Sequence, residues 1–276
     1  MYKPTNIKIA KNTVQLLNAN FENSVLESKV IYQSKLKKLQ ERIAHIQQVY
    51  YLQSKRAIIV FEGWDASGKG GVIRRLTEKL DPRGFSVIPI SIPNPDEQSR
   101  HYLYRFQKEL PKAGAITIFD RSYYGRVLVE RIEGLASNKE WQRAYCEINE
   151  FERLLSDDGV RIIKLFLHIT PEEQLIRFYE RLHNPYKHWK ITEEDFRNRL
   201  KWKDYESAIN DMFKQTSTNI ANWNLIAANM KWYARIQALE IICAKLEKGV
   251  DIIPKPLDPE LIEVAKQLLG ITIRNN

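Results

Sequence analysis

The sequence predicts an α/β protein built on a doubly wound parallel sheet of about five strands. Short apolar runs alternate with helical patterns along most of the chain. The first of these runs leads directly into a glycine-rich turn, and a later one ends at Asp120, as expected of a parallel strand that delivers an acid to its carboxyl end. We therefore expect a functional site where the carboxyl ends of the strands meet.

The composition predicts a globular chain that can bury a sizeable core. It has 276 residues, of which 43% are hydrophobic. We find no apolar run of transmembrane length and no signal-peptide pattern, so we expect a cytoplasmic protein. Cys146 and Cys243 are far apart and lack metal-ligand spacing, which predicts reduced thiols rather than a disulfide or a zinc site.

The first elements are an irregular arm at residues 1–27 and an amphipathic helix at residues 28–53. Apolar side chains recur along this helix in alternating steps of three and four. Its face could pack within the chain or against a second subunit, which would make a homo-oligomer, a dimer or a tetramer. The apolar positions are Leu36, Leu39, Ile43, Ile46 and Tyr50.

The next stretch, AIIVFEGWDASGKGGV at residues 57–72, reads as a strand, a phosphate-binding loop and the start of a helix that runs from about residue 70 to 80. Glycines allow backbone angles that would clash with a Cβ, so successive N–H groups can point inward at phosphate oxygens. The helix adds the positive end of its dipole. We expect phosphate contacts from Gly63, Ala66, Ser67, Gly68, Lys69, Gly70 and Gly71.

The hydroxyl that usually follows the loop lysine and binds a metal is missing, because Gly70 stands there. Asp65, inside the loop, is the expected substitute. Asp120 would be a second metal-binding acid beside the loop, although it could instead cap the next helix. Arg121 and Arg126 are then placed to meet phosphate oxygens.

The remaining elements follow the same alternation of strand and helix. Prolines end the second strand, and a capping box of Thr170 and Glu173 starts the helix after the fourth. The expected elements are a strand at 85–92, a helix at 101–110, a strand at 115–119, helices within 127–155, a strand at 160–169, a helix after Thr170, a strand at 223–228 and a helix to about 248. Pro254, Pro256 and Pro259 predict a surface strap in a tail at 251–276.

Residues 174–190 carry a run of cations that predicts a lid over the site, at about residues 171–200. Arg177 and Arg181 lie four residues apart, on one helical face, and Lys187 follows. A closing lid would bring these cations to the transferring phosphoryl group and exclude water. The alternative is a solvated basic helix.

The net charge of +9 indicates a preference for polyanions. A nucleic-acid partner would rest on charge alone, because no zinc-finger spacing, basic tail or aromatic RNA-binding signature is present. We therefore expect neither nucleic acid nor a membrane as a partner.

At these residues the chain resembles the polyphosphate kinase 2 family, which is related in architecture to thymidylate-kinase-like P-loop kinases. The resemblance runs from about Tyr32 to Leu246. It rests on FEGWDASGKGGVIRRL at 61–76, IFDRSYYGRVLVER at 118–131, EFERLLSDDGV at 150–160, NPYKHWKITEEDFRNR at 184–199 and the helix around Ala234 and Arg235.

The resemblance implies a P-loop kinase domain at 28–250 that transfers a terminal phosphoryl group between inorganic polyphosphate and an adenine or guanine nucleotide. It implies Mg²⁺, with Mn²⁺ as an alternative, held by Asp65 and Asp120. The catalytic residues it implies are Asp65, Lys69, Asp120, Arg121 and Arg181, with Arg177 as a second lid arginine.

The motif sequences are most similar to those of polyphosphate:AMP phosphotransferases, which commonly fuse two such domains. Members that accept both AMP and ADP often carry Asn where this chain has Asp120, and relatives tend to have Asp near Asn229 and Met230. The choice between AMP and ADP stays open. Competing hypotheses are an ATP-dependent nucleotide or small-molecule kinase and a non-catalytic polyanion-binding protein; the paired acids Asp65 and Asp120 argue against the latter.

Overall fold

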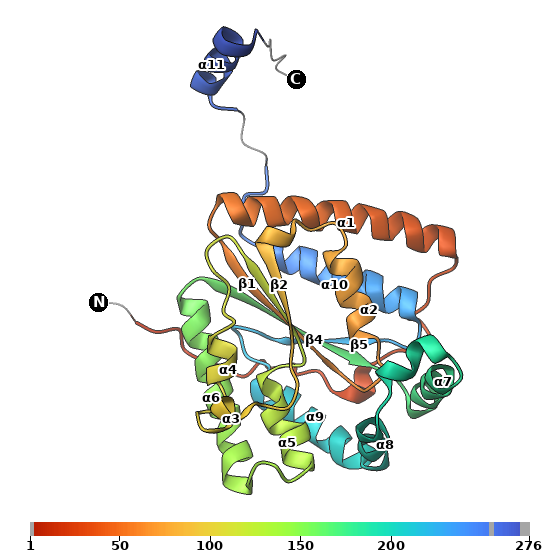
Figure 1. Cartoon of the computed structure of the whole chain (residues 1–276). Helices are drawn as coiled ribbons and strands as arrows, with labels where there is room; N and C mark the ends of the chain where they lie inside the picture. Colours follow the sequence, from red (N-terminus) through yellow and green to blue (C-terminus); the bar gives the residue numbers. More distant parts are fainter. Residues whose placement is uncertain (1–2, 254–256, 271–276) are drawn as a thin grey trace.

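The chain folds around one parallel sheet, as the alternating pattern predicts (Figure 1). The computed structural model describes residues 3–253 and 257–270. The strand order is β2-β3-β1-β4-β5, and every neighbouring pair is parallel. The strands are β1 Arg56–Gly63, β2 Phe85–Pro89, β3 Ile116–Asp120, β4 Val160–His168 and β5 Trp223–Ala227.

The strand order changes direction at β1. From β1 the chain crosses to β2, returns to β3 beside β1, and then continues to β4 on the other side of β1. Connections that leave neighbouring strands in opposite directions open a crevice at the carboxyl edge of the sheet, where ligands bind in folds of this class. The glycine-rich turn after β1 lies at this point.

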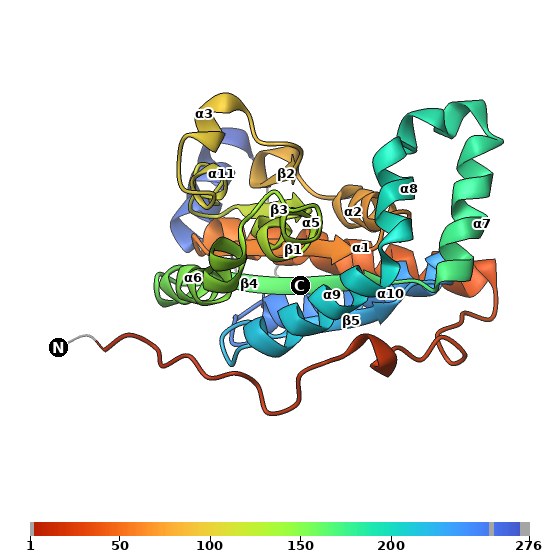
Figure 2. The same cartoon turned by 90° about the horizontal axis from the view of Figure 1, so that it is seen from below.

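Helices cover both faces of the sheet (Figures 1 and 2). The α-helices are α1 Lys29–Leu52, α2 Lys69–Thr77, α3 Pro95–Gln98, α4 Tyr104–Gln107, α5 Val129–Ile132, α6 Asn138–Asp157, α7 Pro171–Leu182, α8 Glu193–Leu200, α9 Trp202–Thr216, α10 Lys231–Glu247 and α11 Pro259–Leu269. The 3₁₀ turns are η1 Leu16–Asn18, η2 Pro82–Gly84, η3 Tyr123–Val127 and η4 Pro185–Lys190.

The two adjoining strands β1 and β4 form the centre of the core. In β1, every residue from 57 to 62 is buried, and in β4 all residues except Arg161 are buried. Strands covered on both faces need apolar side chains on both sides, which is why these runs are nearly continuous rather than alternating. Lys164 is the charged exception inside β4.

The predicted helix at residues 28–53 is confirmed as α1, which lies over α2 and α10 as an outer layer (Figure 1). Ser28 caps it by accepting a hydrogen bond from the N–H of Ile31. The hydroxyl of Tyr50 donates to the carbonyl of Leu246, 2.9 Å away, in α10. The apolar face of α1 therefore packs within the chain, and pairing with a second subunit stays a prediction.

Residues 3–27 form an irregular arm that runs along one side of the molecule (Figure 2). The N–H of Ala10 donates to the carbonyl of Ser217 at 2.7 Å, and the N–H of Leu16 donates to Oδ1 of Asn210 at 3.0 Å. Leu16 is buried. The arm is therefore packed against α9 and the turn that follows it.

Two predicted elements have other bounds in the structure. The second strand ends at Pro89 rather than residue 92, because its neighbour β3 ends at Asp120, the residue in register with Pro89. The helix expected at 101–110 is reduced to α4, Tyr104–Gln107. Residues 202–216, for which the sequence pattern above predicts no element, form helix α9.

The expected lid region, residues 171–200, is helical throughout most of its length and consists of α7, η4 and α8. Figure 2 shows α7 and α8 projecting from one end of the sheet and joined at their far ends. Only half of the expected capping box forms. Thr170 accepts from the N–H of Glu173, but its own N–H donates to Asn229, because Glu173 pairs with Arg177 instead.

Residues 257–270 of the tail do not form the expected strap. Pro259 starts helix α11, which has no buried residue, while Pro254 and Pro256 lie outside the described residues. Within the part of the chain that the structure describes, no helix is long and apolar enough to cross a membrane.

Candidate active site

The phosphate loop, residues 63–70, has the glycine geometry that its sequence predicts. Gly63 adopts φ +146°, and a Cβ there would lie 2.4 Å from the carbonyl oxygen of Leu167 in the neighbouring strand. Gly68 adopts φ +104°. Both positions therefore require glycine. Ala66 also has a positive φ, +61°, a strained conformation for a residue with a side chain.

The ammonium of Lys69 lies inside this loop. It donates to the carbonyl of Gly63 at 2.7 Å and to that of Trp64 at 3.2 Å. Burial and then the neighbouring Arg121 lower the pKa of Lys69, while nearby carboxylates act in the opposite direction. The hydroxyl of Ser67 is buried and has no hydrogen-bond partner among the described residues. The loop thus holds polar donors in a position that suits an anion.

Asp120 is the last residue of β3 and lies beside the start of α2. It is in register with Phe61 of β1. A Cβ added to Gly70 would lie 4.0 Å from Oδ2 of Asp120. The carboxylate of Asp120 therefore lies close to the first turn of α2. Farther along that turn, Gly71 lies under the guanidinium of Arg235, which would be 3.6 Å from an added Cβ.

Arg121 links the two acidic segments of the site. Its guanidinium donates from Nη2 to Oδ1 of Asp65 at 2.9 Å. Its φ of +63° is unusual for a residue with a side chain, and its N–H donates to the carbonyl of Phe61 at 3.0 Å. The structure thus brings together the predicted residues Asp65, Lys69, Asp120 and Arg121.

Arg177, one of the two predicted lid arginines, does not have the expected role. It is 3% exposed. Two of its N–H groups donate to the carbonyls of Ala66 and Ser67, two donate to those of Ala228 and Asn229, and Nε donates to Glu173. All five donors of the guanidinium are therefore used within the protein. Arg177 therefore stabilises the phosphate loop through its carbonyl groups and has no N–H left for a phosphate group.

The other predicted lid cations lie farther along α7 and η4. Nη1 of Arg181 donates to the carbonyl of Lys190 at 2.5 Å and is 3.7 Å from Asp195. Burial lowers the pKa of Arg181, while the carboxylates of Asp195 and Asp65 act to raise it. Lys187 lies in η4, 3.9 Å from Glu180. Among the described residues, neither cation forms a hydrogen bond or an ion pair with the phosphate loop.

Arg126, the remaining predicted phosphate contact, lies in η3. It pairs with Glu130 at 3.1 Å, and its guanidinium lies over the ring of Tyr102, 4.5 Å from the ring centroid. Its Nε is buried and has no hydrogen-bond partner among the described residues. The structure does not join Arg126 to the loop residues.

Helix α8 contributes two polar residues that sequence reasoning missed. Nδ2 of Asn198 donates to Oδ2 of Asp65 at 2.8 Å, and Glu194 lies 3.6 Å from Arg121. The hydroxyl of Tyr205 donates to Oδ1 of Asn198 at 3.0 Å and so fixes the amide. The lid segment therefore contacts both Asp65 and Arg121.

An aromatic stack joins the loop to the end of the lid segment. The rings of Trp64 and Trp202 are parallel within 4°, with centroids 3.6 Å apart. Trp64 precedes Asp65, and Trp202 is the first residue of α9. On its other side, the indole N–H of Trp64 donates to Nδ1 of His168 at 2.8 Å. Burial lowers the pKa of His168 to about 4, which keeps this nitrogen available as an acceptor.

Glu62, at the end of β1, is a further buried acid that sequence reasoning missed. Its Oε1 accepts from the hydroxyl of Ser122 at 2.7 Å. Burial raises the pKa of Glu62 to about 7, against the opposing effects of Ser122, Lys69 and Arg121. The only sequence signal was an acid inside an apolar run.

The donor set suits a metal that binds only one or two protein carboxylates. Within residues 3–253 and 257–270, no three His, Cys, Asp or Glu side chains gather as a potential metal site. Asp65 and Asp120 offer two carboxylates near the phosphate loop. Mg²⁺ commonly uses one or two carboxylates and completes its octahedral shell with water and substrate phosphates, so these two residues fit such a metal.

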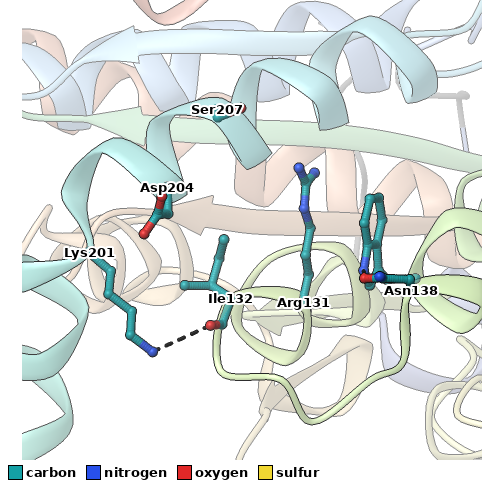
Figure 3. Close-up of a pocket in the computed structure, with 7 residues that line it drawn as sticks. Arg131, Ile132, Asn138, Lys201, Asp204 and Ser207 are labelled. Carbon is teal, nitrogen blue, oxygen red and sulfur yellow. Dashed lines mark hydrogen bonds between the residues drawn. The ribbon is translucent and has the colours of Figure 1, made fainter.

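A separate hollow of about 320 Å³ lies beside α9 (Figure 3). Its cations already have partners, since Arg131 is 2.9 Å from Asp211 and Lys201 is 2.9 Å from Glu133. Figure 3 also shows the contact of Lys201 with the carbonyl of Ile132. The hollow does not include the phosphate loop. It is lined by Arg131, Ile132, Asn138, Trp141, Lys201, Asp204 and Ser207.

Comparison with known proteins adds independent information. A family model described as Polyphosphate kinase 2 (PPK2) matches residues 26–251. A polyphosphate:AMP phosphotransferase of Pseudomonas syringae pv. tomato is 47% identical over 238 residues, which cover 86% of this chain and 48% of that protein. The chain therefore spans about half the length of such curated relatives.

Two further matches extend over most of both partners. An AMP/ADP-polyphosphate phosphotransferase of Meiothermus ruber is 37% identical over 219 residues, 79% of this chain and 82% of that protein. The crystal structure of polyphosphate kinase 2 from Arthrobacter aurescens TC1 has a TM-score of 0.85 and 31% identity, with 93% of each chain covered.

Proposed function

The chain belongs to the polyphosphate kinase 2 family, and on that premise we propose that it transfers a terminal phosphoryl group between inorganic polyphosphate and a nucleoside mono- or diphosphate. The observation that carries the proposal is the cluster at the carboxyl edge of the sheet. There the phosphate loop with Lys69 meets Asp120 of β3, and Arg121 is bonded to Asp65. A protein that merely bound polyanions would gain little from two acids at this position.

The chemistry needs charge stabilisation more than proton transfer. The acceptor is a nucleotide phosphate oxygen, which is already anionic near neutral pH, so a strong general base is not required. The barrier lies in bringing two polyanions together in line. Lys69, the N–H groups of the loop and Arg121 would bind and align the phosphates, with no covalent enzyme intermediate.

A divalent metal completes the proposal, and we expect Mg²⁺, with Mn²⁺ as an alternative. Asp65 and Asp120 would hold it, and when bound it supplies positive charge to the phosphate oxygens. The contacts of Asp65 with Arg121 and Asn198 fix the plane of the carboxylate and leave each oxygen a further lone pair.

The lid segment would exclude water during transfer. We expect Arg181 to approach the phosphoryl group when α7 and α8 move, because the carboxylate of Asp65 in the phosphate loop already acts on its guanidinium. Arg177 would keep the loop in shape through its carbonyl contacts. We also expect a homo-oligomer, which light scattering on the purified protein would test.

The decisive experiment supplies long-chain polyphosphate, Mg²⁺ and either AMP or ADP, and resolves the products by ion-exchange chromatography. Formation of ADP from AMP would identify a monophosphate acceptor. Formation of ATP from ADP, with no AMP produced, would identify a diphosphate acceptor. Chelation of the metal should stop turnover. If neither nucleotide is phosphorylated but ATP is consumed with another acceptor, the chain is an ATP-dependent kinase and our proposal is wrong.

A further inference from the structure

A fully buried ion pair lies behind the catalytic edge of the sheet. Nζ of Lys164, in β4, is 2.9 Å from Oε2 of Glu152, in α6, and the two side chains are 0% and 1% exposed. The ammonium also donates to the hydroxyl of Tyr124 at 2.8 Å and to the carbonyl of Thr216 at 2.7 Å. All three of its donors are therefore satisfied.

The other carboxylate oxygen of this pair holds two tyrosines. Oε1 of Glu152 accepts from the hydroxyl of Tyr123 at 2.9 Å and from that of Tyr124 at 2.8 Å. Burial is the largest cause that raises the pKa of both phenols, so both stay protonated and act as donors. These tyrosines begin η3, immediately after Asp120, Arg121 and Ser122.

The same turn is held from its other side by β1. The hydroxyl of Ser122 donates to Glu62 at 2.7 Å and accepts from the N–H of Tyr124 at 3.2 Å. Between these anchors, Arg121 keeps its positive φ of +63°. A strained residue of this kind persists only where the surroundings determine its conformation. The network of Glu152, Lys164 and the two tyrosine hydroxyls supplies that constraint on one side.

Stability alone does not account for the ion pair. Removing two charges from water is costly, and replacing a buried pair by apolar residues of similar volume is often neutral or stabilising. A fully satisfied polar network instead fixes the orientation of its members. In this chain the fixed members carry the turn at residues 120–124.

We propose that Glu152 and Lys164 are a positioning pair, which sets the direction of Arg121 for phosphoryl transfer. Neither residue touches the phosphate loop in its described contacts, so they act through Tyr123 and Tyr124. This inference rests on the proposed function, because it assigns Arg121 to the phosphate groups of that reaction. It also gives a role to the segment EFERLLSDDGV, which contains Glu152.

The test is the apolar double variant Glu152→Leu/Lys164→Met, which keeps the volume and removes both charges. We expect a folded protein with a lower unfolding midpoint, because the buried hydroxyls of Tyr123 and Tyr124 lose their acceptor. We also expect a kcat lower by about 100-fold, since small misplacements of a catalytic group have effects of this size. The KM for the nucleotide should change little. The matched control, Glu150→Leu/Arg153→Met, removes the more exposed ion pairs of Arg153 with Glu150 and Asp157 in the same helix and should leave kcat unchanged.

Binding of inorganic tripolyphosphate, measured by calorimetry, gives a readout that does not depend on turnover. We expect the double variant to bind it several-fold more weakly than the parent. If the parent transfers no phosphoryl group, the proposed function fails, while this comparison still tests the positioning role. A double variant with parental kcat and parental tripolyphosphate affinity would overturn the inference.

If the double variant does not fold, the hydroxyl deletions Tyr123→Phe and Tyr124→Phe test the same network with less disruption. Each should fold and lower kcat, and the combined variant should lower it further. Parental kcat in the combined, folded variant would also overturn the inference.

Discussion

The carboxylate of Glu194 lies 3.6 Å from the guanidinium of Arg121. It reaches this position from α8 of the lid segment, whereas Arg121 follows β3 at the floor of the site. A carboxylate beside an arginine occupies the place that a phosphate oxygen would take in a bidentate contact. In the proposed reaction, the lid segment would therefore compete with an anionic substrate for Arg121.

Glu194→Gln should strengthen the binding of polyphosphate. The pair is partly exposed, so its loss is worth up to about 1 kcal/mol, or about fivefold in affinity. Calorimetric titration with tripolyphosphate at low salt measures the change. Glu193→Gln removes an exposed charge next to it and is the control. An equal gain in both variants would mean that only the overall charge matters.

Arg177 and Arg181 should differ sharply when each is replaced by Met. Arg177→Met leaves four backbone carbonyls and Glu173 without their buried donor, so the free energy of unfolding should fall by about 3 kcal/mol or more. Arg181→Met should cost less than about 1 kcal/mol but lower kcat by about 100-fold. Urea denaturation and transfer assays on both variants check this; equal stability losses would contradict it.

Glu62 should make stability depend on pH. Burial raises its pKa from 4.5 to about 7, so between these values the folded protein holds a proton that the unfolded chain has lost. Glu62 therefore does not lower the free energy of unfolding below pH 4.5, but lowers it by about 3 kcal/mol as the pH rises to about 7. Glu62→Gln keeps an acceptor for Ser122 but cannot ionise.

Denaturant unfolding of the parent and of Glu62→Gln at pH 5 and pH 8 measures this effect. The difference in the free energy of unfolding between the variant and the parent should be about 2.5 kcal/mol larger at pH 8 than at pH 5. His168 acts oppositely in the parent, because burial lowers its pKa to about 4 and stability from it rises between about pH 4 and 6.5. If the difference in the free energy of unfolding between the variant and the parent is the same at both pH values, Glu62 does not cause the pH dependence.

Lys69→Ala and Asp120→Ala should each reduce transfer by at least about 100-fold while the fold survives. Among the described residues, the hydrogen bonds of the Lys69 side chain go to loop carbonyls, and Asp120 is the half-buried last residue of β3. Product formation and circular dichroism would be recorded on the same samples. Normal turnover in either folded variant would refute the assignment of the site.

Affinity for long polyphosphate should fall steeply with salt, because the net charge of +9 attracts a chain of phosphates over many weak contacts. We expect a decrease of about tenfold or more between about 0.05 M and 0.5 M NaCl. Tripolyphosphate, which meets fewer cations, is the control and should respond less. A flat dependence for the long chain would count against an extended basic surface.

Much of the fold could be predicted because its signals are local. The strands are continuous apolar runs, and the loop glycines are required by backbone angles and by the contact of Gly63 with Leu167. Helix α9 was missed although its signal was present. Its buried positions Tyr205, Ala208, Ile209, Met212 and Phe213 have helical spacing.

The site was harder to predict because its contacts join distant segments. Arg177 and Arg181 share a helical face and are separated by a rise of about 6 Å along the helix. The first donates hydrogen bonds to carbonyls of the loop, whereas the second donates to the carbonyl of Lys190. Likewise, the sequence shows a lysine, Lys164, inside an apolar strand, but it does not show that Glu152 is its partner. That contact forms only because α6 packs on β4. Tertiary packing decides such roles.

The stacked rings of Trp64 and Trp202 are an intrinsic spectroscopic probe of this part of the protein. Two parallel indoles this close couple their electronic transitions, so their circular dichroism and fluorescence differ from those of separate tryptophans. One ring belongs to the phosphate loop and the other begins the helix after the lid segment. Movement of the lid would change the overlap of the rings, and so the closing of this site could be followed by spectroscopy without any attached dye.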